Sequence, residues 1–412
     1  MTKILPGDFH YPDRALLAEP YPFYAAMRDN QPVYREPKSG VFFISRYDDI
    51  VEAVRHPEIF SSKRDLMPET DPEIAAIRAK GFRDSTSLTC SDPPEHQRFR
   101  SLVTKVFTPQ VFAGMEAGIR ALCNRLVDRV IDQGIVDLQR EYAGPLPLTV
   151  IADLLGLDHS DLAELKRYSD NYTATLGAQS CPLSRPRMIE CAQSLTDLQL
   201  YLSRVIEARQ AGAGDDVVSR LLAANARAKQ PLDHALLVDM LRIFFIGGNE
   251  TTTLAIGSMT YHLLSSPENY RRVEDDPKLI PRAIEETLRC EAPNQWVLRN
   301  VTRDTSLGGV ELPVGSKVCL LWGSANRDRD RFGADAERFY LDRPDSQKHL
   351  TFGFGAHFCA GSALARMELR ITLETFIARL RNLRLKPDEP VRYNAHPVMR
   401  GLESLVVQFE PR

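Results

Sequence analysis

A cysteine, Cys359, stands in the glycine-rich segment FGFGAHFCAGSALAR, which covers residues 352–366. Downstream of it, apolar residues recur with the spacing of an amphipathic helix. The cysteine therefore lies near a predicted helix N-terminus, where unpaired backbone N–H groups and the helix dipole favour a thiolate, which is a metal ligand. Glycines let a bulky group approach the backbone closely. The segment predicts a site that holds a large group against sulfur, although a lone cysteine can also be a small buried hydrophobe.

The other six cysteines indicate the cellular compartment of the protein rather than a second metal or redox site. No two of the seven have the two-residue spacing of zinc or thioredoxin-like sites. Their number is odd, and the opening sequence MTKILPGDFHYPD has the features of neither a signal peptide nor a membrane anchor. We therefore expect a cytoplasmic protein with reduced thiols. The net charge of −3 is spread along the chain, which argues against binding to nucleic acid or an anionic membrane.

A second segment whose residues could take part in a reaction is the largely apolar stretch Leu236–Leu264. Its length predicts a buried helix of about 45 Å. Two adjacent glycines, Gly247 and Gly248, weaken a helix by about 1 kcal/mol each, and Glu250 and Thr251 are costly in an apolar interior. One interpretation is a kink or a close helix crossing at the glycines. The other is a widened groove with a carboxylate and a hydroxyl beside it, the groups that proton delivery requires.

The rest of the chain predicts a mainly α fold with a small β contribution. We see no linker, repeat or low-complexity segment, and expect a single domain over residues 1–412. Helical patterns dominate from about residue 110, as at Met115–Ile131 and Ser194–Arg209. Strand patterns are short and occur at Val41–Ser45, Val318–Leu321 and Leu405–Phe409.

Three motifs together resemble the cytochrome P-450 superfamily of haem-thiolate monooxygenases. They are FGxGxHxCxG at residues 352–361, GGxET at 247–251 and the ExxR of Glu286 and Arg289. The likeness continues through residues 92–100 and 326–339, so it spans roughly residues 20 to 410. It implies the cytochrome P-450 fold, with a long central helix over the haem, and is greatest to the soluble bacterial members, which have no membrane anchor.

The resemblance also implies roles for individual residues. Cys359 would be the proximal ligand of the iron of haem b, and Phe352 would pack beside its sulfur. Glu250 would pass protons inward and Thr251 would position them. Glu286 and Arg289 would form a buried structural ion pair joined by Arg338. The remaining cofactor contacts would be Gly247, Gly248, Gly353 and Gly361, and, at the haem propionates, His96, Arg100, Arg299 and His357.

By family position, the substrate pocket is mostly apolar, which predicts a medium-sized hydrophobic substrate. Trp296 either walls this pocket or packs beneath it, and Ile243 can equally be a core residue. The predicted pocket residues are Leu88, Ile243, Ile246, Gln295, Val297, Val398 and Met399.

The expected activity is insertion of one atom of dioxygen into the substrate, by hydroxylation or epoxidation. No flavin or nicotinamide segment is visible, so a separate ferredoxin and its reductase would supply the electrons. Two alternatives stay open: a haem-dependent sensor without turnover, and a haem-thiolate enzyme of rearrangement or coupling chemistry. We expect a monomer, and cations that could meet an acidic electron donor are Arg98, Lys105, Lys348 and Arg366.

Overall fold

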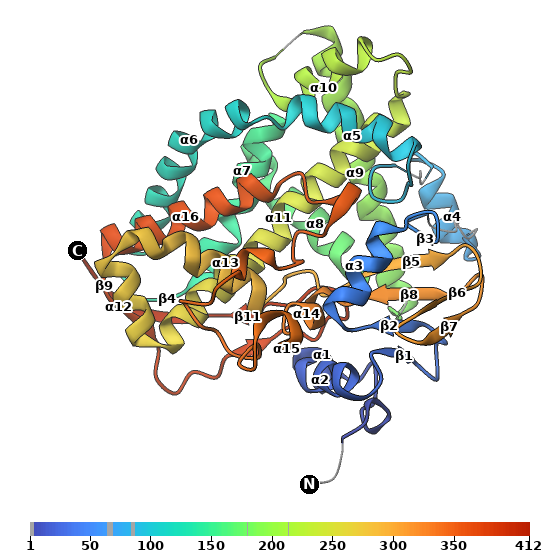
Figure 1. Ribbon diagram of the computed structural model, residues 1–412. Helices are drawn as coiled ribbons and strands as arrows, with labels where there is room; N and C mark the ends of the chain where they lie inside the picture. The colour runs from blue at the N-terminus through green and yellow to red at the C-terminus, as the bar shows by residue number, and fades with distance from the viewer. Residues whose placement is uncertain (1–3, 64–68, 84–86, 179, 213) are drawn as a thin grey trace. The chain divides into compact units, whose positions relative to one another are not determined.

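The computed structural model describes residues 4–63, 69–83, 87–178, 180–212 and 214–412. Helices dominate and the strands are short, which confirms the predicted fold class (Figure 1). The chain divides into two compact units. Unit 1 comprises Met1–Ser62, Ala117–Ala143 and Thr251–Arg412, and unit 2 comprises Lys63–Glu116 and Gly144–Glu250. The single domain over residues 1–412 stays a prediction.

Unit 1 contains all the strands in the described part of the chain. Its largest sheet has the order β1-β2-β8-β5-β3, in which β2 and β8 are parallel and the other pairs are antiparallel. The bounds of these strands are Val33–Arg35 (β1), Phe42–Ile44 (β2), Phe60–Ser61 (β3), Val297–Val301 (β5) and Lys317–Leu320 (β8). A hairpin pairs Thr305–Leu307 (β6) with Val310–Leu312 (β7), and a two-stranded ladder pairs Arg392–Tyr393 (β10) with Leu402–Ser404 (β11). A three-stranded sheet has the order β4-β12-β9, with bounds Ile135–Asp137 (β4), Val406–Pro411 (β12) and Leu380–Leu385 (β9).

Both faces of the main sheet are buried because its central strands alternate between two apolar clusters. Phe42 and Ile44 pack with Val318 and Leu320 in one cluster. The intervening Phe43 packs with Cys319 and Leu321 in the other. Since successive side chains of a strand point to opposite faces, a nearly continuous apolar run is what a strand buried on both faces requires. The strand predictions at residues 41–45, 318–321 and 405–409 fall on β2, β8 and β12.

The helices of unit 1 frame these sheets. The last of them, α16, begins at Ser362, directly after Gly361, and packs against α13. The helices are Arg14–Ala18 (α1), Tyr21–Asn30 (α2), Tyr47–Arg55 (α3), Pro267–Asp275 (α12), Ile280–Cys290 (α13), Trp322–Ala325 (α14), Arg329–Phe332 (α15) and Ser362–Arg379 (α16).

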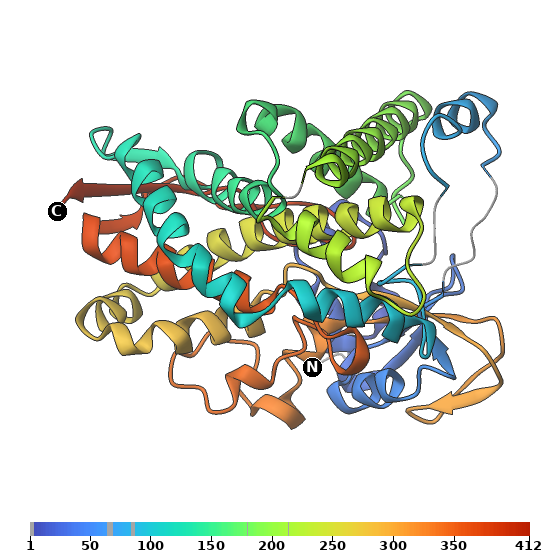
Figure 2. The ribbon, with the colours of Figure 1, turned by 90° about the horizontal axis from the view of Figure 1, so that it is seen from above.

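Unit 2 has only helices in its described residues. Pairs α8 and α9, and α4 and α9, pack along each other (Figure 2). Helix α7 ends at Gly156, whose left-handed φ of 63° suits glycine at a helix C-terminus. The bounds are Pro72–Arg78 (α4), Glu95–Val106 (α5), Pro145–Leu155 (α7), Leu162–Leu176 (α8), Arg185–Ala211 (α9) and Val217–Ala226 (α10).

Two helices cross the division between the units: Pro109–Asp128 (α6) and His234–Ser265 (α11). The 32 residues of α11 include the predicted segment 236–264 and rise about 48 Å along the helix axis. Among the described residues, no helix combines the length and the hydropathy needed to cross a membrane.

Candidate active site

The Cys359 loop is a tight turn fixed by backbone hydrogen bonds. Gly353 and Gly355 have φ values of 73° and 68°, a region that disfavours residues with a side chain. The N–H of Gly353 donates to the Leu350 carbonyl, and the N–H of Cys359 donates to the Phe352 carbonyl, each over 2.8 Å. These contacts hold Cys359 three residues before α16 begins, where the helix N-terminus stabilises a thiolate.

The Cys359 loop exposes apolar side chains. Cys359 is exposed, and so are two large aromatic residues of the same loop, Phe354 and Phe358, at 36% and 41%. Water solvates exposed aromatic groups poorly, and a large flat group bound at the thiol would cover apolar surface of the loop. The residues of this loop therefore fit a haem whose iron is bound by the Cys359 sulfur.

Phe352 connects the loop to an ion-pair network that we did not predict. Its ring centroid lies 5.7 Å from that of His349, and the Arg366 guanidinium lies 4.5 Å over it. Arg366 donates to both carboxylate oxygens of Glu285, over 2.6 and 2.9 Å. Burial alone would raise the pKa of Glu285, but hydrogen bonds from Arg366 and His349 outweigh it and lower the pKa to about 2. Glu285 thus fixes the cation that covers Phe352.

The two glycines of α11 have different environments. A side chain on Gly248 would meet Ile151 of α7 at 2.8 Å, so this glycine permits a close helix crossing. A side chain on Gly247 would meet nothing within 4 Å, and Gly247 is exposed. The close-crossing interpretation therefore applies to Gly248, whereas Gly247 borders open space.

The open space belongs to one face of α11. Partly or fully exposed positions recur every three to four residues along the helix, whereas Phe245 and Asn249, which lie between them, are 0% and 1% exposed. Asn249 points away from this face, since its amide nitrogen donates to the Ser169 hydroxyl over 2.8 Å. We call the open positions the open face of α11; they are Ile243, Gly247, Glu250 and Thr251. Arg242, whose guanidinium lies over the ring of Tyr172 on α8, is turned toward α8 like Asn249.

Glu250 lies near charged residues of α8. Burial raises the pKa of its carboxyl group, Lys166 opposes this shift and Asp170 adds to it. Lys166 and Asp170 form an ion pair in which both side chains are more than 40% exposed. A carboxyl group with a raised pKa keeps its proton to a higher pH than an exposed one, and a general acid–base group is most effective when its pKa approaches the operating pH. Glu250 thus combines a raised pKa with the influence of solvated charges on α8.

The residues predicted to contact the propionates form two pairs, each of a histidine and an arginine, one pair in each unit. In unit 2, His96 and Arg100 lie one turn apart on α5. Burial, and then the charge of Arg100, lower the pKa of His96. In unit 1, Arg299 lies on β5 and donates to the Leu298 carbonyl over 2.8 Å, and His357 Nε2 lies 3.1 Å from the Ser62 hydroxyl.

The predicted ion pair of Glu286 and Arg289 is confirmed, but its third member is corrected. Both side chains are 0% exposed, and Arg289 Nε donates to Glu286 over 2.8 Å. The guanidinium that joins them is that of Arg343, whose Nε donates to Glu286 over 3.0 Å. Arg338 contributes its backbone carbonyl to Arg289 instead, because the chain turns that carbonyl inward at this point.

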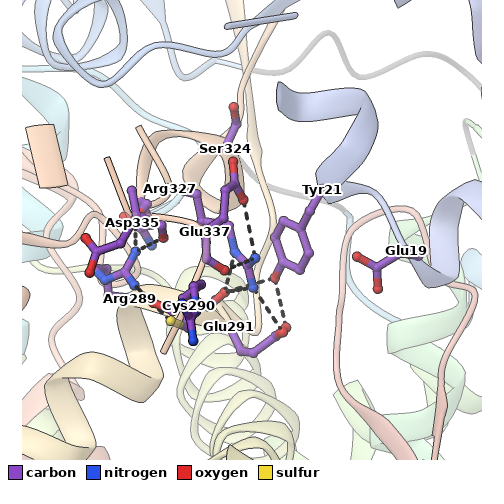
Figure 3. A network of polar contacts seen from close by, with 12 residues as sticks. Glu19, Tyr21, Arg289, Cys290, Glu291, Ser324, Arg327, Asp335 and Glu337 are labelled. Atoms are coloured by element: carbon purple, nitrogen blue, oxygen red, sulfur yellow. Dashed lines mark hydrogen bonds and ion pairs between the residues drawn. The ribbon is translucent and has the colours of Figure 1, made fainter. Parts of the chain in front are cut away.

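A second buried network surrounds Glu291, the residue after α13, and was also missed (Figure 3). Tyr21 donates to Glu291 over 2.8 Å, and Arg400 donates over 2.9 Å. Arg327 lies 3.4 Å from Glu291 and 3.4 Å over the Tyr21 ring. These residues lie up to 379 positions apart from Tyr21 to Arg400 in the chain, and no sequence pattern connects them.

The predicted substrate residues separate into two groups. In unit 2, Leu88 and Ile246 are buried, and Ile243 is on the open face of α11. In unit 1, Val297 is partly exposed, and Val398 and Met399 are buried, with their N–H groups donating to His396 Nδ1.

Two predictions at neighbouring positions have different outcomes. The prediction that Gln295 offers a polar group to the pocket is wrong: it is 2% exposed, packs against Gly323 and donates to the Ala292 carbonyl. Trp296 packs against the cluster around Phe43 and donates to the Pro397 carbonyl over 2.6 Å, which favours the packing interpretation.

Comparisons with known proteins agree on one family. Residues 182–404 match the cytochrome P-450 family. A steroid C26-monooxygenase of Mycobacterium tuberculosis is 35% identical over 389 residues, covering 94% of this chain and 93% of that protein. Cytochrome P-450 107B1 of Saccharopolyspora erythraea is 34% identical, covering 96% of each chain.

Solved structures show the same fold. The cytochrome P-450 CREJ, in complex with (4-ethylphenyl) dihydrogen phosphate, has a TM-score of 0.88 at 31% identity, covering 96% of this chain and 98% of that one. CYP109E1 from Bacillus megaterium, in complex with testosterone, has a TM-score of 0.84 at 31% identity, with coverage of 96% and 99%. Because relatives over the full length are monooxygenases, a sensor without turnover is set aside. The chain belongs to the cytochrome P-450 family and is a haem-thiolate monooxygenase whose iron ligand is Cys359.

Proposed function

We propose that this enzyme inserts one atom of dioxygen into a medium-sized, mostly hydrophobic substrate, by hydroxylation or epoxidation. The observation that carries the proposal is the open face of α11, where Gly247 leaves space directly before Glu250 and Thr251. Ile243 and Ile246 line the approach, so affinity comes mainly from apolar burial, at about 25 cal/mol per Å². Relatives that act on or bind steroids support an elongated, steroid-like substrate.

Proton supply is the part of the chemistry that this chain's own residues perform. Haem with a thiolate ligand supplies dioxygen activation and O–O cleavage when it is bound. Glu250 takes up protons beside the solvated pair Lys166 and Asp170, and the Thr251 hydroxyl passes them inward. Phe352, covered by Arg366, shields the sulfur from water. Substitution of Glu250 or Thr251 therefore changes how oxygen is used more than it changes the binding of haem or substrate.

The cofactor contacts follow from the same proposal. His96 and Arg100 in unit 2, and Arg299 and His357 in unit 1, meet the haem propionates as hydrogen-bond donors. Neutralising a carboxylate in this way needs donors that are already held in place. The burial of His96 and the hydrogen bonds of Arg299 and His357 support this role.

Electrons come from a separate ferredoxin and its reductase in the cytoplasm, where the enzyme acts as a monomer. The odd number of cysteines, seven, supports the compartment, since it does not suit a disulfide framework. Among the candidate docking cations, Arg366 is occupied by Glu285, Lys348 by Asp345, and Arg98 by backbone carbonyls. Lys105 is exposed and is therefore the best position at which to test docking of the ferredoxin. Lys105→Glu slows reduction of the haem by the ferredoxin, and added salt weakens this effect.

The decisive test of the proposed function compares two neighbouring threonines of α11. Thr251→Ala keeps haem and substrate binding, but product formed per reductant consumed falls several-fold and hydrogen peroxide rises. Thr252 is 3% exposed and lies off the open face, so Thr252→Ala keeps the parent's ratio. Equal ratios in the parent and in Thr251→Ala would overturn the proton-delivery role.

A further inference from the structure

An ion pair lies beside the Cys359 loop. Arg366 is in the second turn of α16, about 6 Å along the helix axis from its first residue, Ser362. Its guanidinium lies 4.5 Å over the Phe352 ring and donates to both carboxylate oxygens of Glu285 on α13, over 2.6 and 2.9 Å. The Phe352 carbonyl accepts from the Cys359 N–H. One residue, Phe352, thus contacts both the ion pair and the iron ligand.

The third polar side chain of this cluster is a neutral histidine. His349 Nδ1 accepts from the Thr351 N–H over 3.2 Å, so the proton of the neutral ring is on Nε2. Nε2 lies 3.3 Å from the Glu285 carboxylate, and the His349 side chain is 1% exposed. Burial lowers the pKa of His349, which keeps the ring neutral. The charges of Glu285 and Arg366 therefore cancel, and the three side chains together have no net charge.

The pair is sheltered enough for an unbalanced charge to act on the haem. The side chains of Glu285 and Arg366 are 15% and 34% exposed, so salt and water screen them less than a surface pair. Reduction adds one negative charge at the iron, which a nearby positive charge favours and a nearby negative charge opposes. Loss of one partner therefore shifts the reduction equilibrium in the direction set by the charge of the partner that remains.

We propose that Glu285 is a positioning residue that, through Arg366, sets the reduction potential of the haem bound at Cys359. It holds the guanidinium over Phe352 and cancels its charge. The step concerned is the transfer of one electron from a reductant to ferric iron, which gives ferrous iron. The inference rests on the ligation of haem by Cys359 and is independent of the proposed substrate and of the proposed electron donor.

The test is a redox titration of the purified haem protein with dithionite and mediator dyes, followed in the absorption spectrum. It is run at about pH 8, where carboxyl groups are ionised. Glu285→Gln leaves the Arg366 charge unbalanced and raises the midpoint potential. Arg366→Gln leaves the Glu285 carboxylate unbalanced and lowers it, and each shift is a several-fold change in the equilibrium constant for reduction. The double variant lacks both charges, so its potential returns toward that of the parent.

The matched control is Glu374→Gln, on the same helix. Glu374 lies eight residues beyond Arg366, a rise of about 12 Å, and pairs with Arg120 and Arg370. This variant removes the same charge from α16 at a greater distance from the loop, so its shift is smaller than that of Glu285→Gln. A shift as large as that of Glu285→Gln would show an effect of net charge alone and overturn the inference.

The signs of the two single variants separate charge from structure. If the pair only sealed the loop against water, loss of either partner would admit water and shift the potential in the same direction, which would overturn the inference. Either single variant tests the sign by itself where the other does not retain haem. A parent without the red-shifted band of the reduced carbonyl complex would overturn the ligation by Cys359, and this inference with it.

Discussion

Among the helices that carry an acid and an arginine three residues apart, α13 and α11 place the pair in different surroundings. Glu286 and Arg289 on α13 are completely buried. Arg289 also donates to the carbonyls of residues 326, 336 and 338. Asp239 and Arg242 on α11 have the same spacing but an accessible edge. The same local pattern thus gives one pair that ties distant segments together and one that stays partly open to solvent.

The difference lies in what completes each guanidinium's hydrogen bonding. Burying a charge pair is favourable only where further hydrogen bonds replace the lost water. At Arg289 the backbone provides them, so the pair fixes the segment 326–343 against α13. At Arg242 the partners are two side chains, Asp239 and Tyr172, and the pair keeps an accessible edge. Breaking the sealed pair should therefore have a larger effect than changes at accessible positions.

Breaking the sealed pair should cost the most stability. Glu286→Gln strands Arg289 and Arg343, and the free energy of unfolding falls by about 3–5 kcal/mol. Denaturant unfolding, followed by the haem absorbance, measures the loss. The control is Asp345→Asn, which breaks an exposed pair with Lys348 and costs less than about 1 kcal/mol. A small loss for Glu286→Gln would show that the buried pair does not hold the fold together.

Removing the proton carrier on the open face should slow turnover rather than unfold the protein. Glu250→Gln lowers the rate of oxygen consumption tenfold or more, since general acid–base groups contribute roughly 10²–10⁴-fold. An oxygen electrode measures the rate under saturating reductant. Glu190→Gln, at an exposed position of α9, is the matched control. Unchanged oxygen consumption in Glu250→Gln would remove Glu250 from the proton path.

A smaller effect is expected from pH at the network beside Cys359. The folded pKa of Glu285, about 2, is below its ordinary value of 4.5, so ionisation stabilises the fold above pH 4.5. This stabilisation is lost as pH falls toward 2. The stability difference between the parent and Glu285→Gln shrinks by at most about 0.8 kcal/mol between pH 6 and pH 4. Denaturant midpoints at the two pH values measure it, and a difference that grew on acidification would contradict the assignment.

The sequence predicted what depends on local pattern. The Cys359 loop, the glycine pair of α11 and the spacing of Glu286 and Arg289 all encode a turn or a helix face. Residue contacts set by topology were not predictable in this way. Arg343 takes the place expected of Arg338 because the chain turns between them. Gln295 lies in an extended segment, where a shift of one residue reverses the direction of a side chain, and it points into the core.

The measurement that tests the account most directly is the absorption spectrum of the reduced carbonyl complex. With Cys359 as thiolate ligand, the parent shows the strongly red-shifted Soret band of that ligation, and Cys359→Ala abolishes it. Cys123→Ala and Cys319→Ala, at buried positions away from the loop, keep the band. A parent spectrum without the red shift, or a red-shifted band that survives Cys359→Ala, would contradict the assignment of Cys359 and the enzyme chemistry built on it.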